Sequence, residues 1–127
     1  MAQKYVYIVH PFFGDTKTDP RTNYEKIGEI ARLIRKNEPD VVVLSPAHMC
    51  GWLWTTEDPC TNPETLGTCI EYMEIADEVR VFGEYTRTLH CMAEIERARF
   101  LGLDIVFEDG RRERSDASVL CINSVEE

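Results

Sequence analysis

Glu94 is the residue whose place in the sequence points most directly to chemistry. If residues 88–102 form a helix, with about 100° between successive residues, Glu94 shares a small, apolar face with Cys91, Ile95 and Ala98. Such a face should pack against a sheet, where an unpaired carboxylate is costly. Glu94 is therefore expected to be either a paired structural acid or a working carboxylate. A working carboxylate could be a nucleophile, a general base or a clamp for ligand hydroxyls.

Glu94 must be positioned by the strands and helices that alternate along the chain. Buried or alternating apolar runs predict strands at 5–9, 40–44, 78–83, 104–107 and, as a possible terminal strand, 118–122. Helical spacing of apolar residues predicts helices at 23–37, from about 61–64 to 77, and 88–102. The segments left as loops are 10–15, 47–64, 84–87 and the charged turn 108–116.

This order predicts an α/β protein with an open, mainly parallel sheet of four to five strands and helices on both faces. With no linker rich in Pro, Gly or Ser, residues 1–127 are expected to form a single domain. Ligands of such sheets bind at the carboxyl ends of the strands. The loops that follow Val9, Leu44 and Gly83 should therefore converge near Glu94.

Composition excludes several classes of function. The net charge of −9 argues against binding a nucleic acid polymer, which needs a basic face. No apolar run approaches the roughly 20 residues that cross a bilayer, and the first residues lack the pattern of a signal peptide. We therefore expect a cytoplasmic protein that does not associate with a membrane. The absence of Gly-rich phosphate fingerprints and of a Gly-x-Ser-x-Gly elbow argues against common dinucleotide, triphosphate and serine-hydrolase chemistry, and we expect no cofactor.

The five cysteines are expected to be reduced and buried or idle. A zinc site built from His48, Cys50, Cys60 and Cys69 is conceivable, but its spacing does not fit the common frameworks, so no metal is expected.

Aromatic residues offer candidate surfaces for binding a ligand or a partner. Phe12 and Phe13 after the first strand either pack into the core or form a flat wall for a planar ligand. In the long loop, Trp52 and Trp54 favour an ordered cover or a partner surface.

Two segments in order resemble a known family. Tyr7-Ile8-Val9-His10-Pro11-Phe12-Phe13, together with Glu94 and the Ala98-x-x-Leu101-Gly102 that follows it, is similar to the nucleoside 2-deoxyribosyltransferase-like superfamily. The resemblance covers roughly 4–108. It implies a flavodoxin-like (Rossmann-like) sheet and a site for a small nucleoside or nucleotide.

The resemblance also implies roles for individual residues. Glu94 falls on the family's nucleophile, which attacks the anomeric carbon of the sugar and holds it covalently, as in retaining glycosidases. Tyr7 falls on the tyrosine near the sugar, and Phe13 on the aromatic that borders the base. The other ligand-binding candidates are His10, Pro11, Phe12, Ser45, Gly83, Thr88, His90 and Cys91.

Several positions depart from the family pattern. Cys69 stands where the family has a supporting aspartate, whereas Asp77 is expected to be a structural residue at a helix-to-strand junction. Thr88, six residues before Glu94, either contacts a 5'-phosphate or only caps its helix. His90 replaces a glycine of the phosphate-binding turn, and either protonates a leaving base or is a surface or capping residue.

These observations favour hydrolysis or transfer at the N-glycosidic bond of a nucleoside or nucleotide. The alternative is a catalytically weak or inactive module that binds, senses or sequesters a nucleotide, and the missing acid at Cys69 favours this second hypothesis. A third possibility is an interaction protein that uses Trp52 and Trp54. Because relatives often complete their site across a dimer, a homodimer or higher oligomer is expected, with Asn123 as a candidate for reaching the neighbour.

Overall fold

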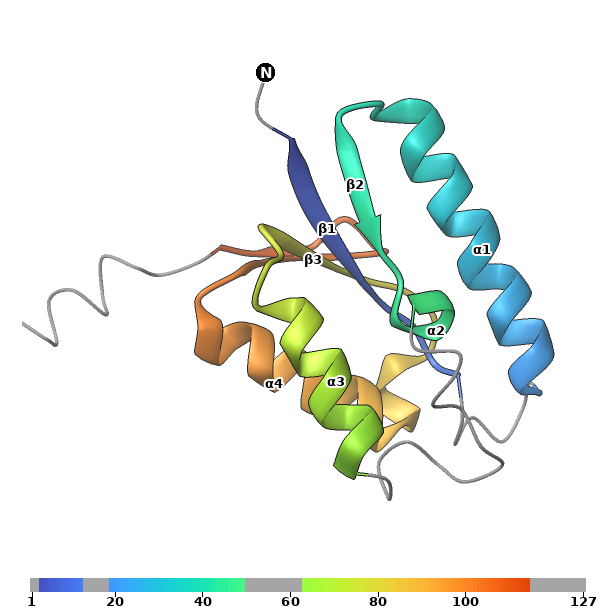
Figure 1. Cartoon of the computed structure of the whole chain (residues 1–127), viewed down its shortest axis with the longest axis vertical. Coiled ribbons are helices and arrows are strands. Elements are labelled where there is room, and N and C mark those ends of the chain that lie inside the picture. Colours follow the sequence, from blue (N-terminus) through green and yellow to red (C-terminus); the bar gives the residue numbers. More distant parts are fainter. Residues whose placement is uncertain (1–2, 13–18, 50–62, 115–127) are drawn as a thin grey trace, which may run out of the picture.

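A computed structural model of the chain describes residues 3–12, 19–49 and 63–114 (Figure 1). The strands are β1 (Lys4–Val9), β2 (Val41–Leu44), β3 (Glu78–Val81), β4 (Asp104–Phe107) and β5 (Arg112–Glu113). The helices are α1 (Pro20–Asn37), α2 (Pro46–Met49), α3 (Pro63–Met73), the 3-10 helix η3 (Tyr85–Arg87) and α4 (Leu89–Leu101). Predictions on Phe13, the Trp52/Trp54 segment, 118–122 and Asn123 lie outside the described residues.

The strands form one sheet in the order β2-β1-β3-β4-β5. The first four strands run parallel, and β5 runs antiparallel to β4 at the edge. Strand β1 lies between two others, so its residue Tyr7 pairs with Leu44 of β2 on one side and Val79 of β3 on the other. The predicted open, mainly parallel α/β sheet is thus confirmed.

Helices lie on both faces of this sheet, α1 on one side and α3 with α4 on the other (Figure 1). Alternate residues of β1 accordingly enter two separate cores. Val6 and Ile8 pack with Ile27 of α1, whereas Tyr7 and Val9 pack with residues of α3 and α4. Among the described residues, none of the helices combines the length and the apolar character that crossing a bilayer requires.

Four segments differ from the sequence-based expectation. The charged turn 108–116 contains β5, whose Arg112 and Glu113 lie on a water-facing edge, where charged residues are common and hide the strand pattern. The first residues of the expected loop 47–64 belong to the short helix α2, and part of the loop 84–87 is η3. Helix α1 starts at Pro20 rather than near 23 because Asp19 caps it.

The junction residue Asp77 has the structural role expected for it. Its carboxylate Oδ2 accepts the N–H of Tyr5 at 2.8 Å, and its own N–H donates to the Tyr5 carbonyl at 2.8 Å. These bonds fix the start of β3 against β1. Because β1 and β3 carry the loops that border the site, Asp77 helps to set their relative register.

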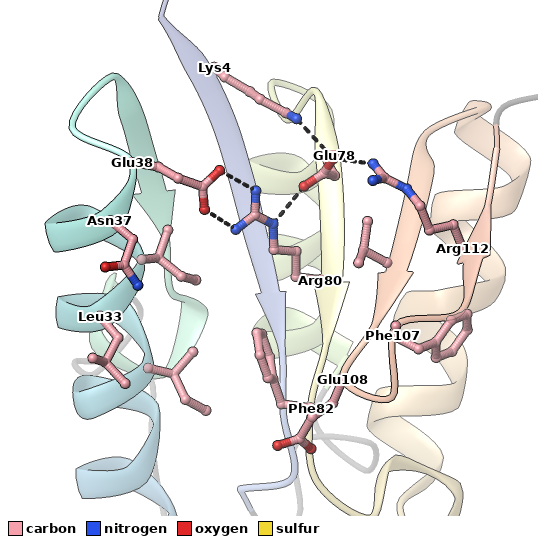
Figure 2. Close-up of a pocket in the computed structure, with 14 residues that line it drawn as sticks. Lys4, Leu33, Asn37, Glu38, Glu78, Arg80, Phe82, Phe107, Glu108 and Arg112 are labelled. Carbon is pink, nitrogen blue, oxygen red and sulfur yellow. Dashed lines mark hydrogen bonds and ion pairs between the residues drawn. The ribbon is translucent and has the colours of Figure 1, made fainter.

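A groove of about 670 Å³ lies beside α1 on the side of β3 that faces away from α4 (Figure 2). At one end of it Arg80 of β3 joins two acids. Its guanidinium donates two bonds to Glu38, of 2.6 and 2.9 Å, and one to Glu78, of 2.6 Å. Glu78 also accepts from Lys4 at 2.9 Å and from Arg112 at 3.4 Å. The network ties α1, β1, β3 and β5 together.

Candidate active site

Helix α4 places Glu94 at the carboxyl end of the sheet. Thr88 caps the helix, its hydroxyl accepting the N–H of Cys91 at 3.3 Å, and Gly102 ends it in a left-handed conformation, with φ of 73°. The buried face of α4 includes Cys91, Glu94, Ile95 and Ala98, as the helical spacing predicts. Only 2% of the surface of Glu94 is exposed, so its carboxylate is removed from water.

Two side chains hold this buried carboxylate. The phenol of Tyr7, fully buried on β1, donates a hydrogen bond to Oε2 of Glu94. One turn before Glu94 on α4, His90 places its Nε2 at 3.2 Å from Oε1. Both carboxylate oxygens are therefore positioned, one by strand β1 and the other by helix α4 itself.

The loops after β1 and β2 reach the same place, as their position at the strand ends predicts. Together with His90 and Glu94 they border a narrow cavity of about 20 Å³, lined also by Ile8, His10, Phe12, Ile27, Pro46 and Ala47. A cavity of this size holds about one water molecule. The cavity between these described side chains is too small for a nucleoside unless the lining residues move. One of the lining residues is His90, which stands where the family pattern has glycine.

Not every predicted ligand-binding residue reaches this cavity. Cys91 is buried in the core between α4 and the sheet. Ser45, also buried, forms a 2.7 Å hydrogen bond with Nδ1 of His48. Burial of His48, followed by the nearby charge of Arg32, lowers the pKa of this histidine. The Thr88 hydroxyl caps α4, which is one of the two roles expected for it.

Gly83 brings the loop after β3 against the loop after β1. Its φ is +69°, and a Cβ at this position would lie 3.1 Å from Pro11 Cδ and 3.3 Å from His10 Nε2. Glycine therefore permits both the backbone conformation and the close approach. The nearby carbonyl of Pro11 accepts a 2.7 Å bond from Nδ1 of His10.

We expect Gly83→Ala to destabilise the protein by about 1–2 kcal/mol, because alanine is strained at positive φ and its methyl group would press on Pro11. Urea unfolding measures the change. Gly67→Ala is the control, since Gly67 lies on α3 with nothing within 4 Å of the added carbon, and it should stabilise slightly. A Gly83→Ala protein as stable as the parent would contradict the assigned role.

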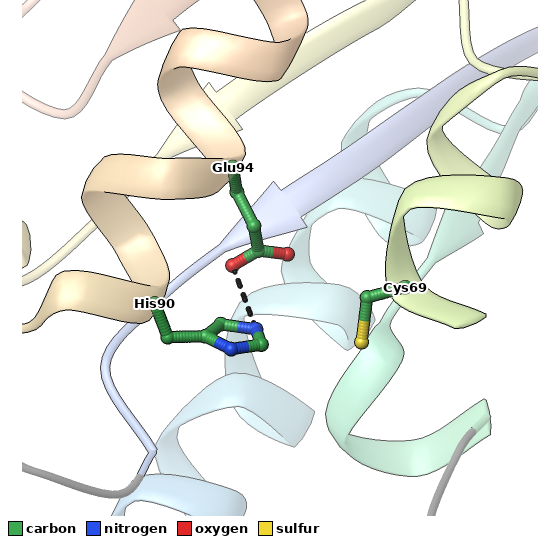
Figure 3. A group of neighbouring side chains, drawn as sticks. All are labelled: Cys69, His90 and Glu94. Carbon is green, nitrogen blue, oxygen red and sulfur yellow. Dashed lines mark ion pairs between the residues drawn. The ribbon is translucent and has the colours of Figure 1, made fainter. Parts of the chain in front are cut away.

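Cys69 lies opposite Glu94 on α3 and is fully buried (Figure 3). Its sulfur, a ring nitrogen of His90 and a carboxylate oxygen of Glu94 all lie within 4.8 Å of one another. Two nearby acids, Glu71 on α3 and Glu74 just after its end, do not take the place of the family's aspartate. Glu74 pairs with Arg97 at 3.6 Å, and Glu71 is exposed. Thus two departures from the family pattern, Cys69 and His90, meet at the one buried carboxylate of this site.

The bond between Tyr7 and Glu94 leads to a testable expectation. Tyr7→Phe should lower the free energy of unfolding by about 1–3 kcal/mol, because it leaves a buried carboxylate with one partner fewer. Urea unfolding gives the value. Tyr85→Phe is the matched control, since the Tyr85 hydroxyl accepts an exposed bond from Arg111, at 2.8 Å, and its loss should cost less than about 0.5 kcal/mol. Equal effects of the two variants would contradict the expectation.

Comparison with solved structures identifies the class of fold. The chain matches a 2-deoxyribosyltransferase from the psychrotolerant bacterium Bacillus psychrosaccharolyticus with a TM-score of 0.59 and 14% identity, over 81% of this chain and 70% of that one. A conserved protein from Enterococcus faecalis matches with a TM-score of 0.61 and 15% identity, over 99% of this chain and 76% of that one. No protein-family model and no curated protein matches the sequence. The chain has the fold of a 2-deoxyribosyltransferase, which confirms the predicted fold.

Proposed function

We propose that this protein cleaves or transfers the N-glycosidic bond of a small nucleoside or nucleotide, with Glu94 as the nucleophile. The observation that carries the proposal is the buried carboxylate of Glu94, held by Tyr7 and His90 at the carboxyl end of β1 in a 2-deoxyribosyltransferase fold. Parallel α/β sheets bind ligands at this edge. A deoxyribosyltransferase acts on a small ligand of this chemical class.

In the proposed reaction a carboxylate oxygen of Glu94 attacks the anomeric carbon of the sugar. The carbon–nitrogen bond breaks, its electron pair goes to the base, and the sugar is held as an ester of Glu94. Water then releases the sugar in hydrolysis, or a second base releases it in transfer. In this proposal the Tyr7 hydroxyl orients the nucleophile, and His90 gives the leaving base a proton. Thr88 and the N–H groups at the start of α4 would receive a 5'-phosphate.

Base release from a panel of nucleosides and nucleotides tests the proposal. Purified protein is incubated with each compound, with and without an added acceptor base, and the products are separated by chromatography. Free base and free sugar would indicate hydrolysis, and a new nucleoside would indicate transfer. If no compound loses its base at any protein concentration, the enzymatic proposal fails.

A nucleotide-binding module without turnover is the second candidate. The observations that favour it are Cys69 in place of the family's acid and the small volume beside Glu94, about 20 Å³. Calorimetry with the same panel separates the candidates, because binding without product supports the module. Absence of both binding and turnover would leave a structural or interaction protein. Light scattering during these measurements would report whether the protein is a homodimer or larger oligomer.

A further inference from the structure

Cys69, His90 and Glu94 form a buried group of three different metal-binding side chains. They come from two facing helices, Cys69 from α3 and the other two from consecutive turns of α4 (Figure 3). One possible ligand atom from each lies within 4.8 Å of the other two. The exposed fraction of each residue is small: 0% for Cys69, 8% for His90 and 2% for Glu94.

We propose that this group binds a zinc ion. Thiolate, imidazole and carboxylate are the three side-chain ligands that Zn²⁺ takes in proteins. A sulfur ligand and a nitrogen ligand disfavour Mg²⁺ and Ca²⁺, which take oxygen atoms. The expectation of no metal came from local spacing around Cys50 and Cys60, whereas this group joins residues 69, 90 and 94 across two helices.

The distances between the three possible ligand atoms are close to those of a zinc site. Ligands at about 2.0–2.3 Å from a tetrahedral zinc ion lie about 3.3–3.8 Å from one another. The distance of 3.2 Å between His90 Nε2 and Glu94 Oε1 lies just below the lower end of this range. The sulfur of Cys69 lies within 4.8 Å of both other ligand atoms, so rotation of the Cys69 side chain is enough to bring it to the distance that zinc requires. The i, i+4 spacing of His90 and Glu94 keeps both ligands on one helix face.

The charges also balance. A divalent ion bound by one thiolate, one carboxylate and one neutral imidazole gives a site with no net charge, which suits a place removed from water. On binding, the thiol of Cys69 gives its proton to solvent, so zinc affinity should rise with pH. Tyr7 already holds the second oxygen of Glu94, as a hydrogen-bond partner behind a metal ligand does.

Three protein ligands leave a fourth zinc position for water. The cavity of about 20 Å³ bordered by His90 and Glu94 has room for about one water molecule. Zinc bound here would occupy the carboxylate proposed as the nucleophile. Zinc should therefore inhibit base release, and this regulatory role rests on the proposed function. Zinc binding itself is measured without any nucleotide, so the zinc site can be confirmed or refuted independently of that function.

The test uses the full chain, freed of metal with a chelator and kept reduced. Zinc is titrated in competition with a chromophoric chelator, and Co²⁺ is used as a spectroscopic probe of thiolate and tetrahedral coordination. We expect one ion per chain, an affinity that falls by at least about 100-fold in Cys69→Ser, and loss of the sulfur-to-cobalt band. Cys91→Ser is the matched control, since Cys91 is equally buried but lies outside the group, and it should bind as the parent does.

His90→Gln is the second variant, so that the inference stays testable if Cys69→Ser does not fold. Circular dichroism checks the fold of each variant before titration. The His90→Gln substitution should also weaken zinc binding at least about 100-fold, while the cobalt–sulfur band remains at saturating metal. Absence of tight zinc binding in the parent protein would overturn the inference. So would zinc binding that persists unchanged in both variants, because the metal would then be bound by other residues.

Discussion

Glu94→Gln is expected to lower the rate of base release by at least about 1,000-fold, the scale seen when a covalent nucleophile is removed. The amide keeps the size of the side chain and can still meet Tyr7 and His90, but it cannot form the ester with the sugar. The loss should therefore appear in kcat with little change in KM. Rates are measured on the best nucleotide of the panel, with EDTA present so that metal does not contribute.

Glu96→Gln is the matched control for this experiment. Glu96 lies on the same helix, but its side chain is 68% exposed and pairs with Arg99 away from the site, so its loss should leave the rate unchanged. Mass spectrometry of acid-quenched protein should find the sugar attached to the parent and to Glu96→Gln, but not to Glu94→Gln. Turnover that survives in a folded Glu94→Gln protein would remove Glu94 from the role of nucleophile.

The helical spacing around Glu94 was enough to place this residue correctly. Because a helix repeats every 3.6 residues, Cys91, Ile95 and Ala98 identified the buried face, and the alternation of strands and helices placed that face at the sheet. The position of Glu94 near the loops after β1 and β2 then follows from the rule that parallel strands end at one edge. Local patterns and one architectural rule were sufficient here.

Cys69 shows what such patterns do not predict. Its place on α3 was expected, but its distance from His90 and Glu94 depends on how α3 packs against α4, which periodicity does not encode. In the proposed zinc site His90 and Glu94 share a local i, i+4 spacing, but Cys69 comes from another helix and has no local spacing to either of them. A signal was nevertheless present, because Cys69 and His90 were both departures from the family pattern, and departures that meet in space can compensate one another.

Arg80 presents the same difficulty on the other side of the sheet. Arg80 lies in the middle of a predicted strand and finds one acid, Glu78, two residues away in that strand, but its other acid, Glu38, comes from the end of α1. The bridge to Glu38 spans 42 residues of sequence, so only the packed sheet reveals it. Burial of Glu78 opposes its ionisation, but hydrogen bonds from Lys4 and Arg80 outweigh that effect and lower its pKa. The hydrogen bond from Arg80 is also the main cause of the lowered pKa of Glu38.

Arg80→Met is therefore expected to lower the free energy of unfolding at pH 7 by about 2–3 kcal/mol. Removing one partner of a buried ion pair costs about 3–5 kcal/mol, and the value is reduced here because the Glu38 side chain is 41% exposed and water screens it. Glu78 is the main source of the loss, since its side chain is only 3% exposed and keeps Lys4 and Arg112 as its remaining partners. Urea unfolding at pH 7 gives the measurement.

The loss should depend on pH with a definite sign. Both carboxyls have a pKa below their ordinary 4.5 in the folded protein, so the stabilisation by Arg80 is present above that value and disappears as the pH falls through the folded values. The stabilities of parent and Arg80→Met should thus converge as the pH falls below 4.5 and through the lowered pKa values of the two carboxyls. Arg99→Met is the matched control: Arg99 makes similar bonds to Glu113 and Glu96, but its side chain is 43% exposed, so the change should stay below about 1 kcal/mol. A difference for Arg80→Met that remained constant from pH 7 to pH 3 would show that its cause is packing of the side chain and not its charge.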